Sequence, residues 1–418
     1  MPLASIAEQL QVAGMSAAAA AAKAAMFARL ADAWPVWCKL GPARAWFVPG
    51  RVELLGKHTD YAGGRSLLCA VERGFCLLAA PRRDRLVRLR DVATGEEQQF
   101  SIGDDPPATW ARYPAIVARR LATDDRLDHG ADIVFASDLP PAAGMSSSSA
   151  LVVASFLALG GEVGAEGREA LAAYLAAAEV GVGTHGGSED HTAILCSQPG
   201  VWSQYRFRPT QCESTLPAPR DMTLVIAASG VVADKSGAAR NAYNHAAAST
   251  SEIVALWNQS TGRQDTTLAA VLSSSAGALA RLQSLLSPRP ALRVRLDQFW
   301  NETEVWIPGA AAAARSGGWP SFGECVSRSQ AAAETALGNQ TPETLALVAS
   351  ARALGAVAAS SFGAGFGGSV WALVSSVEAV DFRRAWQEQY HRAFAVPAAA
   401  SLFFESAAGP AVLEIACV

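Results

Sequence analysis

One stretch of fifteen residues, GRVELLGKHTDYAGG from Gly50 to Gly64, constrains the fold more than any other part of the chain. RAWFVPGRVELLG reads as an apolar β-strand that enters a turn between glycines. This strand and turn gather side chains that carry charge or form hydrogen bonds: Arg51, Lys57, His58, Asp60 and Tyr61. So many polar groups at one bend of a largely hydrophobic chain raise the question of what they face.

Chain length favours two packed domains, because 418 residues exceed what one hydrophobic core usually holds. The proline-rich LPAPR, residues 216–220, is the candidate boundary. We therefore predict an Ala-rich helical N-terminal extension over 1–35, a first lobe over 36–219 and a second lobe over 220–418.

Charge and cysteine usage exclude several classes of function. The net charge is −4, and no basic stripe predicts nucleic-acid binding. The seven cysteines are scattered without zinc spacing, which fits reduced thiols and a cytoplasmic protein. No apolar run approaches the ~20 residues of a membrane helix. The Ala-rich segment 16–34 is predicted to be a helix rather than a signal peptide, because Glu8 precedes it and Lys23 and Asp32 interrupt it.

Hydrophobic periodicity predicts strands and helices in irregular alternation. Strands are expected over residues 67–81, 221–232 and FGGSVWALVS, and a further one at ADIVFASDLPP. In the second half, helices are expected over 235–259, 267–286, 324–336 and 341–356. This order predicts an α+β protein with two lobes.

A serine run is the second notable stretch. In DLPPAAGMSSSSALVVASFLALG, a proline turn and Gly144 lead into Ser146–Ser149, where a long apolar helix begins. The first turn of a helix has unpaired N–H groups, and small residues let a phosphate approach them. It is not the GxxxxGK[ST] loop, because no lysine follows. A serine-rich cap or loop is the alternative.

A late glycine cluster is the third notable stretch. SSFGAGFGGSVWALV, residues 360–374, allows close backbone approach just before a strand. A hairpin turn would also explain these glycines.

Taken together and in this order, the three stretches resemble the GHMP kinases, named for galactokinase, homoserine kinase, mevalonate kinase and phosphomevalonate kinase. HTDYAGG resembles the galactokinase signature in particular. WARY, GVGTHGGSEDH and KSGAARNAYNHA resemble further family segments. The resemblance implies a two-lobed GHMP kinase fold, with an N-terminal ribosomal protein S5 domain 2-like lobe and a C-terminal ferredoxin-like lobe. The site is expected between the lobes.

The activity implied is transfer of the ATP γ-phosphate to a monosaccharide hydroxyl, the anomeric one in galactokinases. Asp190 would be the base, and Arg51 would keep it ionised and stabilise the transferring phosphoryl group. Whether Asp190 removes the proton or chiefly positions the hydroxyl stays open. The alternative for Asp190 is an acid at a solvated helix start, and the alternative for Arg51 is a surface ion pair.

The resemblance also implies the binding residues. His58, Asp60, Tyr243 and the backbone of Gly187 would hold the sugar, and Ser148 and Glu179 are the candidates for Mg²⁺. The remaining predicted ATP contacts are Trp110 and Tyr113 near the adenine, and Gly144, Met145, Ser146, Ser147 and Ser148 at the phosphates. Core aromatics would look the same as Trp110 and Tyr113 in sequence.

Lys57 departs from the family, because galactokinases usually carry Glu there, which contacts the hydroxymethyl end of the sugar. An ammonium donates hydrogen bonds and attracts anions. One hypothesis is a uronic acid recognised through Lys57. The other is a neutral sugar, with Lys57 turned to solvent or paired with an acid. The GSEDH run departs as well and indicates a divergent member.

Two rival functions share the fold. A non-catalytic ATP- and sugar-binding sensor would be suggested by loss of Asp190 or Arg51, and both are present. A kinase for a non-sugar alcohol, such as a mevalonate-like acid, conflicts with HTDY. The expected partners are therefore ATP and a monosaccharide, and the chain is expected to be a monomer or homodimer.

Overall fold

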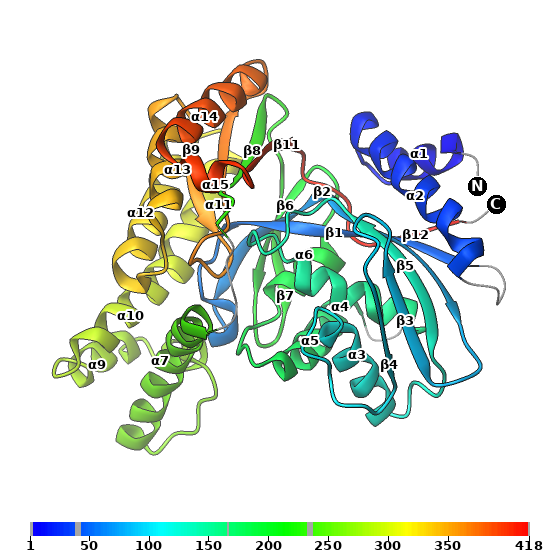
Figure 1. Cartoon of the computed structure of the whole chain (residues 1–418). Coiled ribbons are helices and arrows are strands. Elements are labelled where there is room, and N and C mark those ends of the chain that lie inside the picture. The colour runs from blue at the N-terminus through cyan, green and yellow to red at the C-terminus, as the bar shows by residue number, and fades with distance from the viewer. Residues whose placement is uncertain (1–2, 38–42, 165–166, 232–236, 417–418) are drawn as a thin grey trace.

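The structure, a computed structural model, describes residues 3–37, 43–164, 167–231 and 237–416. Its strands form an eight-stranded sheet and a four-stranded sheet, with helices packed against both (Figure 1). This arrangement confirms the predicted α+β class. None of the described helices has the length and apolar character that a membrane crossing needs.

The large sheet is built around the long strand β2. Its main order is β12-β1-β2-β5-β3-β4, and a hairpin of β6 and β7 continues along the first part of β2. The bounds are β1 (Arg44–Leu55), β2 (Arg65–Pro81), β3 (Leu86–Asp91), β4 (Glu97–Ser101), β5 (Ala131–Ser137), β6 (Val201–Arg206), β7 (Gln211–Pro217) and β12 (Leu413–Ile415). β1 and β2 are antiparallel and join through the polar turn, so the turn lies at the end of a rigid strand pair.

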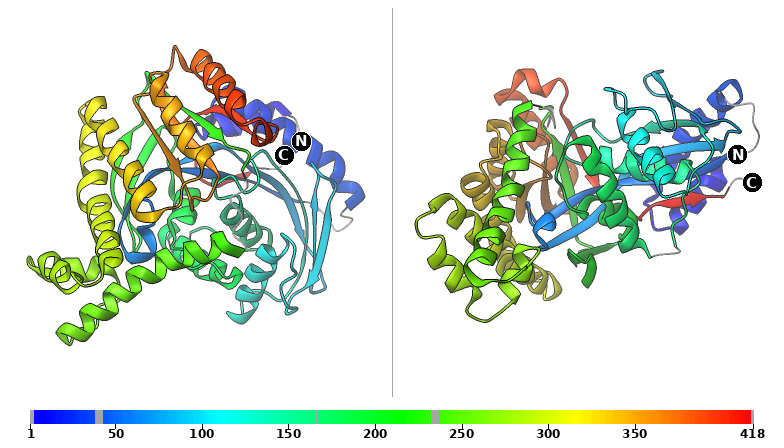
Figure 2. Two further views of the ribbon diagram at one scale, coloured as in Figure 1. Left: turned by 60° about the vertical axis from the view of Figure 1, so that its left-hand side comes forward. Right: turned by 90° about the horizontal axis from the view of Figure 1, so that it is seen from below.

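Helices cover both faces of this sheet. One face packs against α3 (Arg112–Thr123), α4 (Ser147–Ala158), α5 (Arg168–Glu179) and α6 (Glu189–Cys196). The other face packs against α1 (Leu3–Val12) and α2 (Ala17–Trp37), as both views in Figure 2 show. Alternate residues of β1 supply the two cores, because Val48 faces α4 and Phe47 faces α2. The Ala-rich extension is therefore a cover for the outer face of the sheet.

The small sheet has the order β11-β8-β10-β9 and is antiparallel throughout. Its strands are β8 (Met222–Ala228), β9 (Ala358–Phe362), β10 (Ser369–Ser375) and β11 (Leu402–Ser406). α13 (Pro342–Ala353) and α14 (Ala379–Ala393) bury Leu347 and Trp386 against it. Numbered within the lobe, this order is 4-1-3-2, that of a ferredoxin-like sheet. The predicted boundary residues 216–220 lie at the passage from β7 to β8.

The remaining α-helices connect strands of the small sheet: most lie between β8 and β9 in the chain, and the last lies between α14 and β11. They are α7 (Gly237–Thr261), α8 (Leu268–Ser273), α9 (Ala278–Leu285), α10 (Pro290–Trp300), α11 (Ile307–Arg315), α12 (Trp319–Ala332) and α15 (Ala395–Ala398). The expected helix over 267–286 is two helices, α8 and α9. The SSSAG run, residues 273–277, explains the break, because serine and glycine favour turns over helix interiors. Residues 235 and 236 of the expected helix 235–259 lie outside the described residues.

Candidate active site

The polar turn between β1 and β2 is held by its own hydrogen bonds. The Thr59 hydroxyl lies 2.8 Å from the carbonyl oxygen of Gly56 and 2.7 Å from that of Arg65. Gly56 has a φ of 131°, and a Cβ there would lie 2.2 Å from Ser66 Oγ. From α10, Arg295 Nη2 donates to the His58 carbonyl at 2.6 Å. The turn is thus a fixed platform for its side chains.

A cavity of about 580 Å³ opens beside this turn. Residues from β1, the turn, the starts of α4 and α6, α7 and the late glycine cluster line it. Thirteen of the predicted site residues are among them: Arg51, His58, Asp60, Trp110, Tyr113, Gly144, Ser146, Ser147, Ser148, Glu179, Gly187, Asp190 and Tyr243. The structure therefore brings together residues that lie far apart in the sequence.

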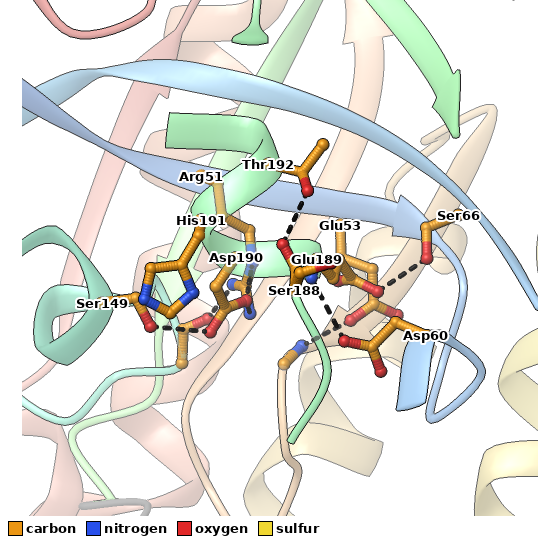
Figure 3. A network of polar contacts seen from close by, with 12 residues as sticks. Arg51, Glu53, Asp60, Ser66, Ser149, Ser188, Glu189, Asp190, His191 and Thr192 are labelled. Atoms are coloured by element: carbon orange, nitrogen blue, oxygen red, sulfur yellow. Dashed lines mark hydrogen bonds and ion pairs between the residues drawn. The ribbon is translucent and has the colours of Figure 1, made fainter. Parts of the chain in front are cut away.

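Arg51 and Asp190 both line the cavity and form an ion pair (Figure 3). Arg51 Nε donates to Asp190 Oδ1 at 2.8 Å, and Nη2 lies 2.5 Å from the same oxygen. Arg51 Nη1 also donates to the carbonyl of Gly144. Burial alone would lower the pKa of Arg51, but Asp190 and two further carboxylates raise it. The guanidinium therefore stays charged and fixes the carboxylate at the first turn of α6.

Ser149 links Asp190 to Glu179. Its hydroxyl lies 2.8 Å from Glu179 Oε2 and 3.3 Å from Asp190 Oδ2. His191 Nε2 lies 3.2 Å from the same Glu179 oxygen. The four consecutive serines cannot be told apart in the sequence. The structure shows that Ser149 contacts Glu179 and that Ser148 lines the cavity too. Sequence reasoning missed Ser149 for this reason.

The serine run forms a loop that leads into α4. Gly144 and Ser146 both have left-handed backbones, with φ of 74° and 59°. The buried Ser146 hydroxyl has no hydrogen-bond partner among the described residues, although it lines the cavity. Met145, a predicted ATP contact, does not line the cavity: its side chain lies in the core and its carbonyl accepts from Arg51 N at 3.3 Å. Only the backbone of Met145 is therefore near the site.

An apolar end of the cavity is built from aromatic side chains. Trp110 packs edge-on against Phe135 with ring centroids 5.4 Å apart, and Phe135 packs against Phe75 at 5.6 Å. Tyr113 also lines this part. Phe75 and Phe135 had no distinguishing signal in the sequence, because each is an ordinary apolar residue of a strand. Such a surface suits a flat base.

His58 is buried at the other end of the cavity with both ring nitrogens near polar partners. Nδ1 lies 3.1 Å from Tyr61 Oη, and Nε2 lies 3.2 Å from the carbonyl of Ala364. A neutral ring protonated on Nε2 satisfies both contacts. Burial, with a smaller contribution from Arg295, lowers the pKa of His58 to about 4.

This lowered pKa predicts a pH-dependent stability. In the unfolded chain His58 takes up a proton below its ordinary pKa of 6.5, whereas the folded protein keeps it neutral to about pH 4. His58 therefore stabilises the fold above pH 6.5, and that contribution falls as the pH is lowered toward 4. Between pH 6.5 and 5, we expect the free energy of unfolding to fall by about 2 kcal/mol more in the wild type than in His58→Gln. Urea unfolding of both proteins across this range measures the difference, and parallel pH curves would contradict it.

Asp60 and Gly187 pack directly against each other. Asp60 Oδ1 accepts from the N–H of Tyr61 at 2.8 Å, and Oδ2 accepts from the N–H of Glu189 at 3.2 Å. A Cβ on Gly187 would lie 2.3 Å from Asp60 Oδ2. The Tyr243 ring, 5.1 Å from that of His58, completes this end. The four residues predicted to hold the sugar thus lie together.

A methyl group on Gly187 should displace Asp60. We expect Gly187→Ala to lower kcat/KM for the sugar by about 10- to 100-fold, since small misplacements in a site have effects of this size. The matched control is Gly181→Ala, whose Cβ meets only the Ile116 side chain, at 3.4 Å. Steady-state kinetics of both variants measure the effect, and equal activities would contradict it.

Lys57 is placed outside the cavity. It is 1% exposed, and Nζ donates to Ser360 Oγ at 2.6 Å, with Ser329 Oγ at 3.5 Å. The carboxylates of Glu53 and Glu302 are its electrostatic partners. Of the two hypotheses for this lysine, the geometry favours pairing with acids over contact with a sugar acid.

The late glycines bring the second lobe against the serine loop. Gly363 has a φ of 79°, and a Cβ there would lie 2.8 Å from the carbonyl oxygen of Gly144. Side chains larger than hydrogen would hold these two backbones apart. The glycine cluster therefore closes the cavity from the β9–β10 side.

Three family descriptions match the sequence. "Galactokinase galactose-binding signature" matches residues 39–81, "GHMP kinases N terminal domain" matches 112–198, and "GHMP kinases C terminal" matches 310–392. Together they cover about half of the chain. The signature that names galactose spans β1, the polar turn and β2.

Curated relatives of this chain are named galactokinases. A galactokinase of Roseiflexus sp. (strain RS-1) is 29% identical over 351 residues, which is 82% of this chain and 87% of that protein. A galactokinase of Chloroflexus aggregans is 40% identical over 116 residues, which is 27% of this chain and 30% of that protein.

Solved structures show the same fold. The crystal structure of Lactococcus lactis galactokinase complexed with galactose has a TM-score of 0.80 at 23% identity, over 93% of this chain and 100% of that one. Methanococcus jannaschii mevalonate kinase has a TM-score of 0.54 at 12% identity, over 88% of this chain and 99% of that one.

Proposed function

This chain belongs to the GHMP kinases and is a galactokinase-like, ATP-dependent sugar kinase, and from that premise we propose that its sugar is galactose, phosphorylated at the anomeric hydroxyl. The observation that carries the proposal is the pair of buried Arg51 with Asp190, which lies beside His58, Asp60, Gly187 and Tyr243 in one cavity.

Asp190 and Arg51 divide the work of phosphoryl transfer. Asp190, held through Oδ1 by Arg51, would accept the proton of the attacking hydroxyl or orient that hydroxyl through Oδ2. Arg51 would then stabilise negative charge on the transferring phosphoryl group from a fixed, buried position. Transfer breaks the bond between the γ-phosphorus and the bridging oxygen of ATP, forms a sugar phosphate and leaves ADP.

ATP would lie along the cavity from the aromatic end to the serine loop. Trp110, Tyr113, Phe75 and Phe135 offer an apolar surface for the adenine. The N-terminus of α4, with the buried Ser146 hydroxyl just before it, suits the phosphates. The γ-phosphate would then reach the region between Gly144 and Asp190.

Magnesium fits the donors at this place. Glu179 and the first-turn serines of α4 offer only oxygen ligands, as Mg²⁺ prefers. No group of three or more His, Cys, Asp or Glu suited to a metal occurs in the part of the chain that the structure describes. Ser148 and Glu179 would hold it, and it would neutralise phosphate charge.

Product analysis tests the proposal. ADP release would be measured with Mg-ATP and galactose, glucose, galacturonic acid or mevalonate, and the product would be identified by phosphorus NMR. Galactose turned over fastest, with phosphate on the anomeric oxygen, is the expected result. A faster uronic acid would favour the sugar-acid alternative, faster mevalonate would overturn the sugar assignment, and ATP binding without turnover on any acceptor would favour a sensor.

A further inference from the structure

A buried carboxylate that the proposed mechanism does not use also lines the cavity. Glu53 lies two residues after Arg51 on β1, so both side chains point to the same face of the sheet. Glu53 is 3% exposed. Figure 3 shows its carboxylate between the Arg51–Asp190 pair and the turn that carries Asp60.

The two oxygens of Glu53 have different environments. Oε2 accepts from the N–H of Gly363 at 3.2 Å, so it ties β1 to the late glycine cluster. Oε1 is buried and has no hydrogen-bond partner within the described residues. A buried carboxylate oxygen without a partner is costly. Because this carboxylate lines the cavity, a bound ligand with a hydroxyl donor can supply the missing bond.

Lys57 is a positive charge that stabilises the buried carboxylate of Glu53. Its ammonium attracts both Glu53 and Glu302, although its hydrogen bonds go to Ser360 and Ser329. Glu302 uses its Oε1 for the N–H of Gly56 and the Ser329 hydroxyl, both at 2.9 Å. Lys57 is therefore a buried counter-ion shared by two acids, and only Glu53 of the two lines the cavity.

Glu189, a buried acid close to Glu53, differs from it in how readily it holds a proton. Glu189 accepts from the Ser66 hydroxyl at 2.6 Å. Burial, together with Glu53 and Asp60, raises the pKa of Glu189 well above its ordinary value. Burial raises the pKa of Glu53 as well, but the positive charges of Lys57 and Arg51 lower it, so Glu189 holds a proton more readily than Glu53 does.

We propose that Glu53 is a further sugar-binding residue, whose Oε1 accepts a hydrogen bond from a hydroxyl of the bound sugar, with Lys57 as its counter-ion. The inference rests on the proposed sugar kinase function and adds a recognition element to it. Lys57 then affects sugar binding without touching the sugar.

Deoxygenated substrates test this contact. Wild type and Glu53→Gln would be assayed with galactose and its 2-, 3-, 4- and 6-deoxy analogues, and binding of each sugar without ATP would be measured by calorimetry. For galactose we expect kcat/KM to fall about 10- to 100-fold, mainly through KM, because the Gly363 N–H retains the amide oxygen and the amide NH2 group, which accepts no hydrogen bond, replaces Oε1. The analogue that lacks the contacted hydroxyl should be equally poor with both proteins, because one interaction cannot be lost twice.

Glu302→Gln is the matched control. It removes a second buried acid beside the same Lys57 and does not alter the cavity wall. We expect it to lower Tm while keeping the wild-type order of the five sugars. If Glu53→Gln does not fold, Glu53→Asp keeps the charge with a shorter side chain and should weaken the dependence on the same hydroxyl.

The outcomes distinguish an incorrect Glu53 contact from an incorrect proposed function. An equal loss with all five sugars would overturn the contact and leave Glu53 as a support for Gly363. A wild-type protein that binds none of the sugars would instead overturn the proposed function itself.

Discussion

Replacing Asp190 by asparagine is expected to lower kcat by about 10² to 10⁴-fold, the range found when a positioned general base is removed. The substitution keeps the shape of the side chain but removes the charge that pairs with Arg51 at 2.5 Å. It also removes the group that we propose to accept the proton of the sugar hydroxyl. In the proposed arrangement ATP lies along α4 and the aromatic end, so the affinity for ATP should change much less.

Single-turnover kinetics with radiolabelled ATP measure the chemical step, and fluorescence titration measures nucleotide affinity. Glu189→Gln is the matched control, because Glu189 is the preceding residue of α6 and also lines the cavity. Its raised pKa favours the neutral form, which glutamine imitates. An Asp190→Asn protein that keeps a tenth or more of kcat would show that this carboxylate is not the base.

Arg51→Lys is expected to lower kcat by about 10² to 10³-fold, although the charge is conserved. A guanidinium can donate to Asp190 and to the Gly144 carbonyl at once, whereas an ammonium on a shorter reach cannot hold both. Asp190 would then lose its fixed orientation, and the transferring phosphoryl group would lose a positioned cation. Because Arg51 is buried, Tm should fall as well.

The control for this substitution lies on the same strand. Arg44 pairs with Glu414 at 2.9 Å, and their side chains are 47% and 50% exposed, so Arg44→Lys should behave like wild type. The readouts are kcat, KM for both substrates and Tm. If the Arg51→Lys protein keeps kcat within a few-fold of wild type, the guanidinium has no role of its own in the transfer step.

The sequence allowed the main architecture and most of the cavity to be predicted. β1, the turn and β2 could be placed because an apolar run, glycines and polar residues follow one another within a short segment. The serine run predicted the start of α4 for a local reason, since serines favour a helix N-terminus over its interior.

Other features depended on contacts between distant segments. The sequence singled out Lys57 but not Glu53, and their relation appears only when Ser329, Ser360 and Glu302 surround the ammonium. Met145 lies inside a phosphate-loop pattern but turns its side chain into the core. β6, β7 and β12 were not predicted, because such short strands carry little periodic signal.

The pairing of β12 with β1 bears on how the protein folds during synthesis. Ala45, Trp46 and Phe47 of β1 pair with Ile415, Glu414 and Leu413 of β12, close to the other end of the chain. Until those residues leave the ribosome, the backbone N–H and C=O groups on this edge of β1 have no strand to pair with. Such edges recruit other chains. Nascent or truncated forms lacking β12 should therefore depend on chaperones, even where every residue of the active site has already been made.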